Sequence, residues 1–271
     1  MAGTLLLRGM LIGIVAGFLC FSFLKIVGEP QVDRAIAFET QLDEAKAQAK
    51  AQPLIAKGLP APKEEPESEL VSRRAQASIG LFTGVMVYNV AFGGLFALAF
   101  ALAYGRMGDF GPRATAAVLA AVGLVAIYIV PNLKYPANPP SVGDPDTIGM
   151  RTELYFSMIA ISVAAMIAAG MLRLRLVARY GAWNAFLIAG AAYLIVVIAV
   201  GLALPAINEV PGQFPAVVLW QFRIASMGAQ IIMWATIGLV FGALMERANR
   251  HYRLPVTDTP QPVPRAPRPS G

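Results

Sequence analysis

Histidine, cysteine and charged residues are scarce in this sequence. The 271-residue chain has one cysteine, Cys20, and one histidine, His251, so an internal disulfide bond and a cysteine-based metal cluster are both excluded. Cys20 lies inside an apolar stretch, where a lone cysteine behaves as a small buried hydrophobe. No HExxH pattern occurs, and His251 follows the last apolar stretch beside Arg250. We therefore expect neither zinc hydrolysis nor histidine-based acid–base catalysis, and interpret the chain as a protein that is not an enzyme.

The sequence is rich in hydrophobic residues and poor in charged ones. Only 14% of the residues are charged and 57% are hydrophobic, whereas a soluble domain carries about 25% charged residues. The net charge of +6 comes from arginines near the ends of apolar stretches, not from a basic face with interleaved aromatic rings. This composition predicts contact with a lipid bilayer and none with nucleic acid.

Six apolar segments are long enough to cross a membrane, because about 20 helical residues span the ~30 Å hydrocarbon core. We predict an all-α integral membrane protein, a bundle of about six transmembrane helices with proline-rich outer loops. No A-x-A cleavage pattern follows the first segment, so we interpret it as an uncleaved helix rather than a signal peptide. The segments are residues 5–27, 78–104, 114–131, 152–172, 184–205 and 217–244.

Polar regions divide the chain further. Residues 28–76 begin with a stretch rich in Ala, Gln, Glu and Lys, which favours a helix. They continue with a proline-bearing stretch of mixed charge that is typical of a disordered linker, and the end of the chain is also rich in proline. The predicted parts are transmembrane helix 1 (1–27), an extramembrane helix and disordered linker (28–76), a five-helix transmembrane core (77–247) and a disordered proline-rich tail (248–271).

Lysine and arginine are distributed unevenly between the two sets of loops. If the N-terminus is cytoplasmic, nine arginines fall on the cytoplasmic side, and the short outer loops hold only Lys134 and Arg151. That distribution follows the positive-inside rule, although the long region 28–76 carries seven basic residues against it. We predict a multi-pass protein of the inner (plasma) membrane with both termini in the cytoplasm.

Glycines recur every four residues in three of the apolar segments. In lipid this spacing lets two helix backbones approach closely. The spacing leaves open whether the partner helix belongs to the same chain, to another subunit or to a second copy in a homo-oligomer. The glycines are Gly9, Gly13 and Gly17, then Gly80 and Gly84, and finally Gly238 and Gly242.

Three proline-bearing segments fall on one side of the membrane in either orientation, because alternate loops share a side. They are residues 28–39, 131–155 and 204–223. In each of them a proline, Pro30, Pro131 or Pro205, stands where an apolar segment is expected to end. The similarity hints at three helical hairpins arranged as parallel repeats.

Arg223 is the most informative single residue. It follows Pro215 by eight residues, about 12 Å along a helix. An arginine at membrane depth costs at least ~2.5 kcal/mol unless it is paired or hydrated. Snorkelling to the headgroups and pairing with Glu209 or Glu153 are both open. Gln230, seven residues on, continues a polar stripe on the same helix face, as a permeation route requires.

The connection 131–155 contains five prolines, which stiffen a loop and lower the entropy lost on fixing it. It forms either a rigid plug with Arg151 and Glu153 as a rim ion pair, or a vestibule that binds a cation or polar solute. For the vestibule we name candidate metal ligands and candidate polar residues of the pathway. The ligands are Asp144, Asp146, Glu153, Glu209 and Glu29, and the pathway residues are Lys134, Tyr135, Asn138, Arg151, Asn208, Arg223 and Gln230.

Four stretches carry a family resemblance: GEPQVDRAIAFE, VSRRAQASIGLFTG, LKYPANPPSVGDPDTIGMRTELY and LPAINEVPGQFPAVVLWQFR. With the apolar spans between them, they resemble the CbtA family of predicted bacterial cobalt transporter subunits over most of residues 5–247. The resemblance implies cobalt uptake, often tied to cobalamin synthesis. It also implies a small single-span, histidine-rich companion of the CbtB type. It brings no established ligand residues to this chain.

The residues support a cobalt pathway only in part. Co²⁺ accepts imidazole readily, whereas carboxylate and carbonyl oxygens suit harder ions, and no histidine lies at membrane level. We expect cobalt as a transported ion and no permanently bound cofactor. Either an oxygen-rich site binds the ion weakly, or the companion supplies the histidines. No Walker A pattern occurs, so ATP coupling would need another subunit. A scaffold without conduction of its own, a membrane enzyme using a carboxylate pair, and a transporter of another solute are the alternatives.

Overall fold

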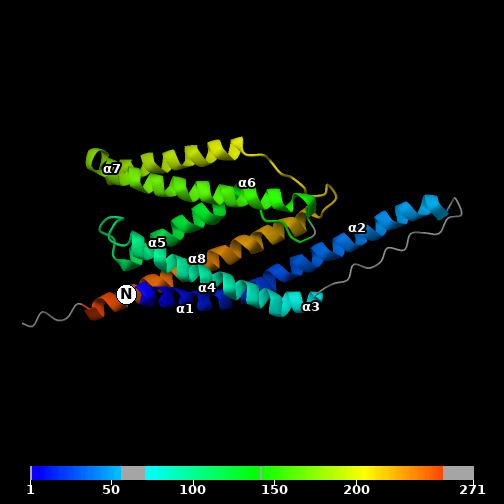
Figure 1. Cartoon of the computed structure of the whole chain (residues 1–271), viewed down its shortest axis with the longest axis horizontal. Coiled ribbons are helices and arrows are strands. Elements are labelled where there is room, and N and C mark those ends of the chain that lie inside the picture. The colour runs from blue at the N-terminus through cyan, green and yellow to red at the C-terminus, as the bar shows by residue number, and fades with distance from the viewer. Residues whose placement is uncertain (1, 56–70, 141, 144, 253–271) are drawn as a thin grey trace, which may run out of the picture.

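The computed structural model describes residues 2–55, 71–140, 142–143 and 145–252. Every regular element in those residues is a helix, and five helices are long and apolar enough to cross a membrane (Figure 1). The prediction of an all-α membrane protein is confirmed. The predicted disordered linker and proline-rich tail fall mainly on residues 56–70 and 253–271, which lie outside the described residues, so the proposed division into four parts stays a prediction.

The chain begins with one continuous helix. It comprises α1 (Ala2–Phe23), a π-helical turn η1 (Leu24–Gly28) and α2 (Glu29–Ile55). We expected Pro30 to end the first span, and that expectation is wrong, because the helix runs on to Ile55. Proline has no N–H for the i→i−4 hydrogen bond, and the wider π-helical turn directly before Pro30 accommodates the loss. In Figure 1, α2 projects beyond the bundle.

The next two spans return across the bundle. Short helical turns α3 (Arg73–Ala75) and η2 (Gln76–Gly80) lead into α4 (Leu81–Ala103). The following span consists of α5 (Pro112–Gly123), the π-helical η3 (Leu124–Ile129) and α6 (Val130–Lys134). Pro131 again lies inside the helix after a π-helical segment, so it does not end the span as expected. Among the three prolines, only Pro205 directly follows a helix end.

Helix α7 (Ile148–Ala203) is a helical hairpin that turns at Gly181, whose φ of 76° favours glycine. A 3₁₀ turn η4 (Pro145–Thr147) precedes it, and we call residues 148–180 its first limb and 182–203 its second limb. A buried 2.8 Å hydrogen bond between the hydroxyls of Ser162 and Tyr193 joins the two limbs. Counted separately, the limbs raise the number of spans to the six expected. The last helix is α8 (Ala216–Tyr252).

Glycines bring the helices of the core together within this chain. A Cβ on Gly13 of α1 would lie 2.4 Å from the carbonyl oxygen of Asn89 in α4, and Gly9 meets Gly93 in the same way. Gly238 of α8 packs as closely against Ala120 of α5. Two of the three glycine runs therefore serve internal packing. Gly84, in the third run, has no atom within 4 Å of where its Cβ would be.

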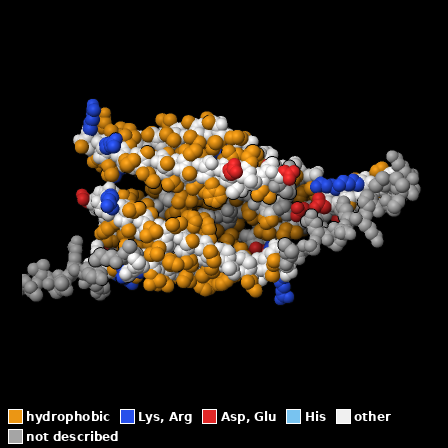
Figure 2. All heavy atoms as spheres, viewed as in Figure 1, with side chains coloured by type: hydrophobic (Ala, Val, Ile, Leu, Met, Phe, Trp, Pro, Cys, Tyr) orange, Lys and Arg blue, Asp and Glu red, His pale blue; other side chains and the backbone are white. Residues whose placement is uncertain are grey.

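The exterior has the pattern of a membrane protein. Figure 2 shows a broad hydrophobic band with charged side chains towards its two ends: mainly lysine and arginine where α7 turns, and both acidic and basic side chains around α2. Large apolar residues such as Leu202 and Trp183 are exposed in this band. Lipid chains cover such residues at little cost, whereas water would not.

Candidate functional site

The three proline-bearing segments meet at one end of the bundle. Ala35 of α2, Val142 of the long connection and Phe214 before α8 form one buried cluster. The ring of Phe38 packs edge-on against that of Phe214, with centroids 5.2 Å apart. We call the described residues of 29–39, 135–147 and 204–215 the loop cap. The sequence predicted that these segments share a side, and the structure brings them into contact.

Hydrogen bonds fix the long connection within the loop cap. Arg223 of α8 donates from Nε to the carbonyl oxygen of Ala137 (3.1 Å) and from Nη2 to Oδ1 of Asn138 (2.9 Å). The hydroxyl of Tyr135 donates to the carbonyl oxygen of Pro205 at 2.9 Å. Burial raises the pKa of this phenol above its usual range. The guanidinium of Arg223 therefore binds the loop rather than the carboxylate of Glu209 or Glu153.

Glu209 is the acidic centre of the loop cap. Its Oε1 accepts a hydrogen bond from the hydroxyl of Thr147 at 2.5 Å, and its Oε2 lies 3.3 Å from Nε of Arg151. Gly143 has a φ of 125°, and a Cβ at this position would lie 2.2 Å from Nη1 of Arg151. Only glycine suits this position, because its φ is unfavourable for other residues and because a Cβ would collide with the guanidinium of Arg151. The ion pair of Arg151 is therefore with Glu209, where we had considered Glu153.

A second ion-pair group holds the start of α2. Arg73 binds Glu29 at 2.5 Å and Asp33 at 2.9 Å through Nη2. Arg34 donates to Oε1 of Gln221 in α8 at 2.9 Å. Glu29 is buried beside Arg73, so the negative charge of its carboxylate is already paired with the guanidinium.

A polar stripe runs from the loop cap into the bundle along α8. Arg223, Ser226 and Gln230 recur at the three- and four-residue spacing of one helix face. The hydroxyl of Ser226 bonds that of Tyr128 at 2.8 Å, and Nε2 of Gln230 donates to the hydroxyl of Tyr88 at 3.4 Å.

The surroundings of the polar stripe are open to one side. Tyr88 remains 42% exposed although it lies well inside the α4 span. Tyr155 of α7 lies near Tyr88 and Tyr128. Figure 2 shows the surface hollowed between the part formed by α6 and α7 and the part formed by α1 and α4.

Aromatic rings close the bundle beyond Gln230. Trp234, one turn further along α8, packs edge-on against Phe92 at 6.0 Å, and Phe241 packs against Phe96 and Phe100 at 5.5 and 5.1 Å. Trp234 and Phe241 are buried, with 6% and 0% of their surface exposed. We call these five residues the aromatic plug. The polar stripe thus opens towards the loop cap and ends on apolar packing.

The remaining predicted site residues are less enclosed. Asp146, Glu153 and Asn208 are exposed, and Lys134 lies over the ring of Tyr135 at 5.8 Å. Asp144 lies outside the described residues. Among the residues that the structure describes, no three His, Cys, Asp or Glu side chains are grouped so that they could hold a metal ion. The carboxylate ligand set stays a prediction.

The sequence analysis did not identify Tyr88, Tyr128, Tyr155 or Ser226. Tyrosine and serine are ordinary residues of transmembrane helices, and the phenols come from α4, η3 and α7, which no local spacing relates. One signal was present: Ser226 lies between Arg223 and Gln230 on the same helix face. Beyond Arg223, the stripe consists of neutral hydroxyl and amide groups, which coordinate an ion weakly.

The comparison with protein families decides the identity. Residues 2–246 match the family described as "Probable cobalt transporter subunit (CbtA)". The chain belongs to the CbtA family. No curated protein and no solved structure matches it.

Membership in the CbtA family fits the helices described above. The chain is a multi-pass membrane protein. Its family is described as a probable subunit of a cobalt transporter, which implies at least one further subunit and names cobalt as the transported ion. The loop cap, the polar stripe and the aromatic plug all lie within the matched residues.

Proposed function

We propose that this chain is the membrane subunit of a divalent cobalt uptake system, with the loop cap as its outer vestibule and the polar stripe as the start of its ion pathway. The observation that carries the proposal is the stripe itself. Arg223, Ser226 and Gln230 face polar partners along one face of α8, inside a bundle whose buried residues are mostly apolar. Polar groups at membrane depth are costly, and they usually face a hydrated cavity or a pathway.

The vestibule would attract the ion, and the stripe would pass it on. The exposed carboxylates of Asp146 and Glu153, with Asp144, would raise the local concentration of a divalent cation. Glu209 and Glu29 are engaged by arginines, so in this conformation they would shape the vestibule rather than coordinate the ion. The hydroxyl and amide groups along the stripe would replace part of the hydration shell and bind weakly enough to release the ion.

A histidine-rich companion of the CbtB type would complete the pathway. Imidazole is a better ligand for Co²⁺ than the neutral oxygens of this chain. The companion would therefore supply the selective step, and movement of the aromatic plug would open the route beyond Gln230.

Both termini and the turn of α7 would face the cytoplasm in the inner membrane. Arg173, Arg175 and Arg179 lie near the α7 turn, whereas the short outer loops hold only Lys134 and Arg151. Counted over the short loops, this distribution follows the positive-inside rule and would put the vestibule outside, although the region around α2 also carries basic residues.

The test is accumulation of radioactive cobalt in cells that express the chain with and without its companion. Gln230→Leu and Tyr88→Phe remove polar groups of the stripe, and we expect uptake to fall about tenfold, the effect of ~1.4 kcal/mol. Tyr193→Phe is the matched control, because Tyr193 bonds Ser162 within α7, away from the stripe. Asp144→Asn/Glu209→Gln tests the vestibule separately.

Each result has one meaning at equal membrane expression. Loss in the stripe variants with uptake kept in Tyr193→Phe supports the pathway. Full uptake in Gln230→Leu and Tyr88→Phe would remove the stripe from it. Uptake no higher than background in every setting would reject transport and favour a scaffold that assembles other subunits.

A further inference from the structure

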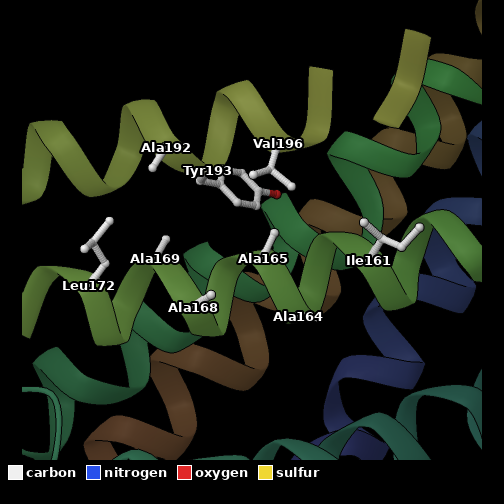
Figure 3. A pocket seen from close by; sticks show the side chains of 9 residues that line it. All are labelled: Ile161, Ala164, Ala165, Ala168, Ala169, Leu172, Ala192, Tyr193 and Val196. Atoms are coloured by element: carbon white, nitrogen blue, oxygen red, sulfur yellow. The ribbon is translucent and has the colours of Figure 1, made fainter. Parts of the chain in front are cut away.

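The α7 hairpin contains an apolar groove between its two limbs. Its volume is about 430 Å³. Figure 3 shows the lining side chains reaching towards one another from the first and the second limb. The polar atom of its lining, the hydroxyl of Tyr193, is engaged with Ser162. The groove therefore suits a hydrocarbon chain rather than a polar solute. It is lined by Ile161, Ala164, Ala165, Ala168, Ala169, Leu172, Ala192, Tyr193 and Val196.

Arginines continue the groove face of the first limb. Lining residues recur at three- and four-residue steps up to Leu172, and the same steps lead next to Arg175 and Arg179. Both arginines are exposed, and Arg173 directly follows the last lining residue of this limb. Residues 173–184 include no acidic residue. The groove thus ends beside a concentration of positive charge that its own segment does not neutralise.

Aromatic residues mark this end of the hairpin as the membrane surface. Tyr180 and Trp183 are 42% and 72% exposed, and the guanidinium of Arg179 lies 5.3 Å from the ring of Tyr180. Tyrosine and tryptophan with outward-facing rings are typical of the headgroup layer. From Leu172 to Arg179 the helix rises about 10 Å, so a chain in the groove and a headgroup at Arg175 and Arg179 can belong to one lipid.

We propose that the α7 groove binds one anionic phospholipid, with an acyl chain between the limbs and its phosphate at Arg175 and Arg179. Charge complementarity selects the occupant. A zwitterionic lipid offers the same chain but no net charge, and basic clusters between membrane helices are suited to anionic headgroups. The exposed face beside the groove, with Ile167 and Leu194 about half exposed, leaves room for a lipid to enter from the bilayer.

The lipid would brace the two limbs of the hairpin against each other. The second limb packs on the first through Ala169, Ala189 and Tyr193, and the main contacts of α7 with other elements of the described residues are with η3, α6 and η4. A chain held between the limbs would add apolar contact where the hairpin has small residues.

Native mass spectrometry of the purified full-length chain tests this inference. The probes are dioleoyl-phosphatidylglycerol and dioleoyl-phosphatidylcholine at equal concentrations. We expect one phosphatidylglycerol to be retained in preference. Arg175→Gln/Arg179→Gln should weaken its retention at least about tenfold. The matched control is Arg106→Gln/Arg247→Gln, which removes two exposed arginines that lie outside the hairpin and should leave retention unchanged.

A second variant tests the groove without changing charge. Ala164→Leu/Ala168→Leu enlarges two exposed lining residues and should reduce retention of phosphatidylglycerol by excluding the chain. Equal retention of the two lipids by the unmodified protein, or equal loss in the arginine control, would overturn the proposal. Retention unchanged by filling the groove would also overturn it, because a headgroup held by arginines alone is not this site.

Discussion

Arg223 of α8 and Asn138 of the proline-rich connection are joined by a 2.9 Å hydrogen bond, although 85 residues separate them in the sequence. The bond ties the loop cap to the helix that carries the polar stripe. Any movement of the loop cap would therefore displace the side chain of Arg223, which lies one helical turn from Ser226. The vestibule and the pathway proposed here are mechanically connected through this pair.

Removing that connection should loosen the cap. Arg223→Met keeps an unbranched apolar stem but deletes both donors, and leaves the carbonyl oxygen of Ala137 and Oδ1 of Asn138 without them. Hydrogen bonds to charged groups contribute about 1.5–3 kcal/mol. We expect faster hydrogen exchange across residues 136–143. Lys134→Met is the control, since Lys134 only lies over a ring; equal exchange in both variants would contradict the role of Arg223.

Gly143→Ala should destabilise the cap through two effects. An alanine at a φ of 125° is strained, and its Cβ would meet the guanidinium of Arg151 and push it from Glu209. We expect a loss of about 1–3 kcal/mol, measured as a lower midpoint of thermal unfolding in detergent. Gly149→Ala lies in a helix with nothing within 4 Å of the added atom, so it should be neutral or slightly stabilising.

Gly13→Leu should separate α1 from α4. The new side chain would collide with the backbone of Asn89 and Val90, at 2.4 and 2.8 Å from its Cβ, and backbone atoms cannot rotate away. Overpacking of this kind costs about 1–3 kcal/mol or more. The measurement is the fraction of monodisperse protein after extraction. Gly84→Leu, where the space is open, should retain a normal fraction; if it does not, Gly84 packs against another subunit or a second copy.

Trp234→Leu should weaken the aromatic plug. Trp234 is buried against Phe92, and Leu leaves space in the core at a cost of about 2–4 kcal/mol. If the plug closes the pathway, liposomes containing this variant should leak cobalt faster than those containing the unmodified chain. The control, Trp220→Leu, changes a tryptophan of the same helix that is 66% exposed. An unchanged leak in the folded Trp234 variant would mean that these rings do not seal the route.

The spans were predictable from the sequence because apolar length and helix formation are local properties. The same reasoning expected Pro30 and Pro131 to end their helices, and both expectations were wrong. Proline removes one hydrogen bond and does not by itself determine whether the chain turns. Here π-helical turns before both prolines absorb the loss. At Pro205 the chain does leave the helix, with Leu204 already extended.

The partners of individual residues were not predictable. The sequence identified Arg223, Gln230 and the outer carboxylates as polar groups in unusual places. It could not show that Arg223 binds a loop or that Glu209 binds Arg151. These contacts join segments tens of residues apart, and several arrangements of the same helices would satisfy the same hydrophobic pattern.

The sequence by itself determined that the chain is a helical membrane protein, where its apolar spans lie, and which proline-bearing segments share a side. Those properties follow from the free-energy cost of burying polar backbone groups and charges in lipid. Each spanning segment must avoid that cost through its own helix and its own apolar side chains. Only the tertiary structure decided that the glycines of α1 pack on α4, that three phenols gather around one face of α8, and that α7 folds into a grooved hairpin. These features depend on shape complementarity between distant segments, which no single segment encodes.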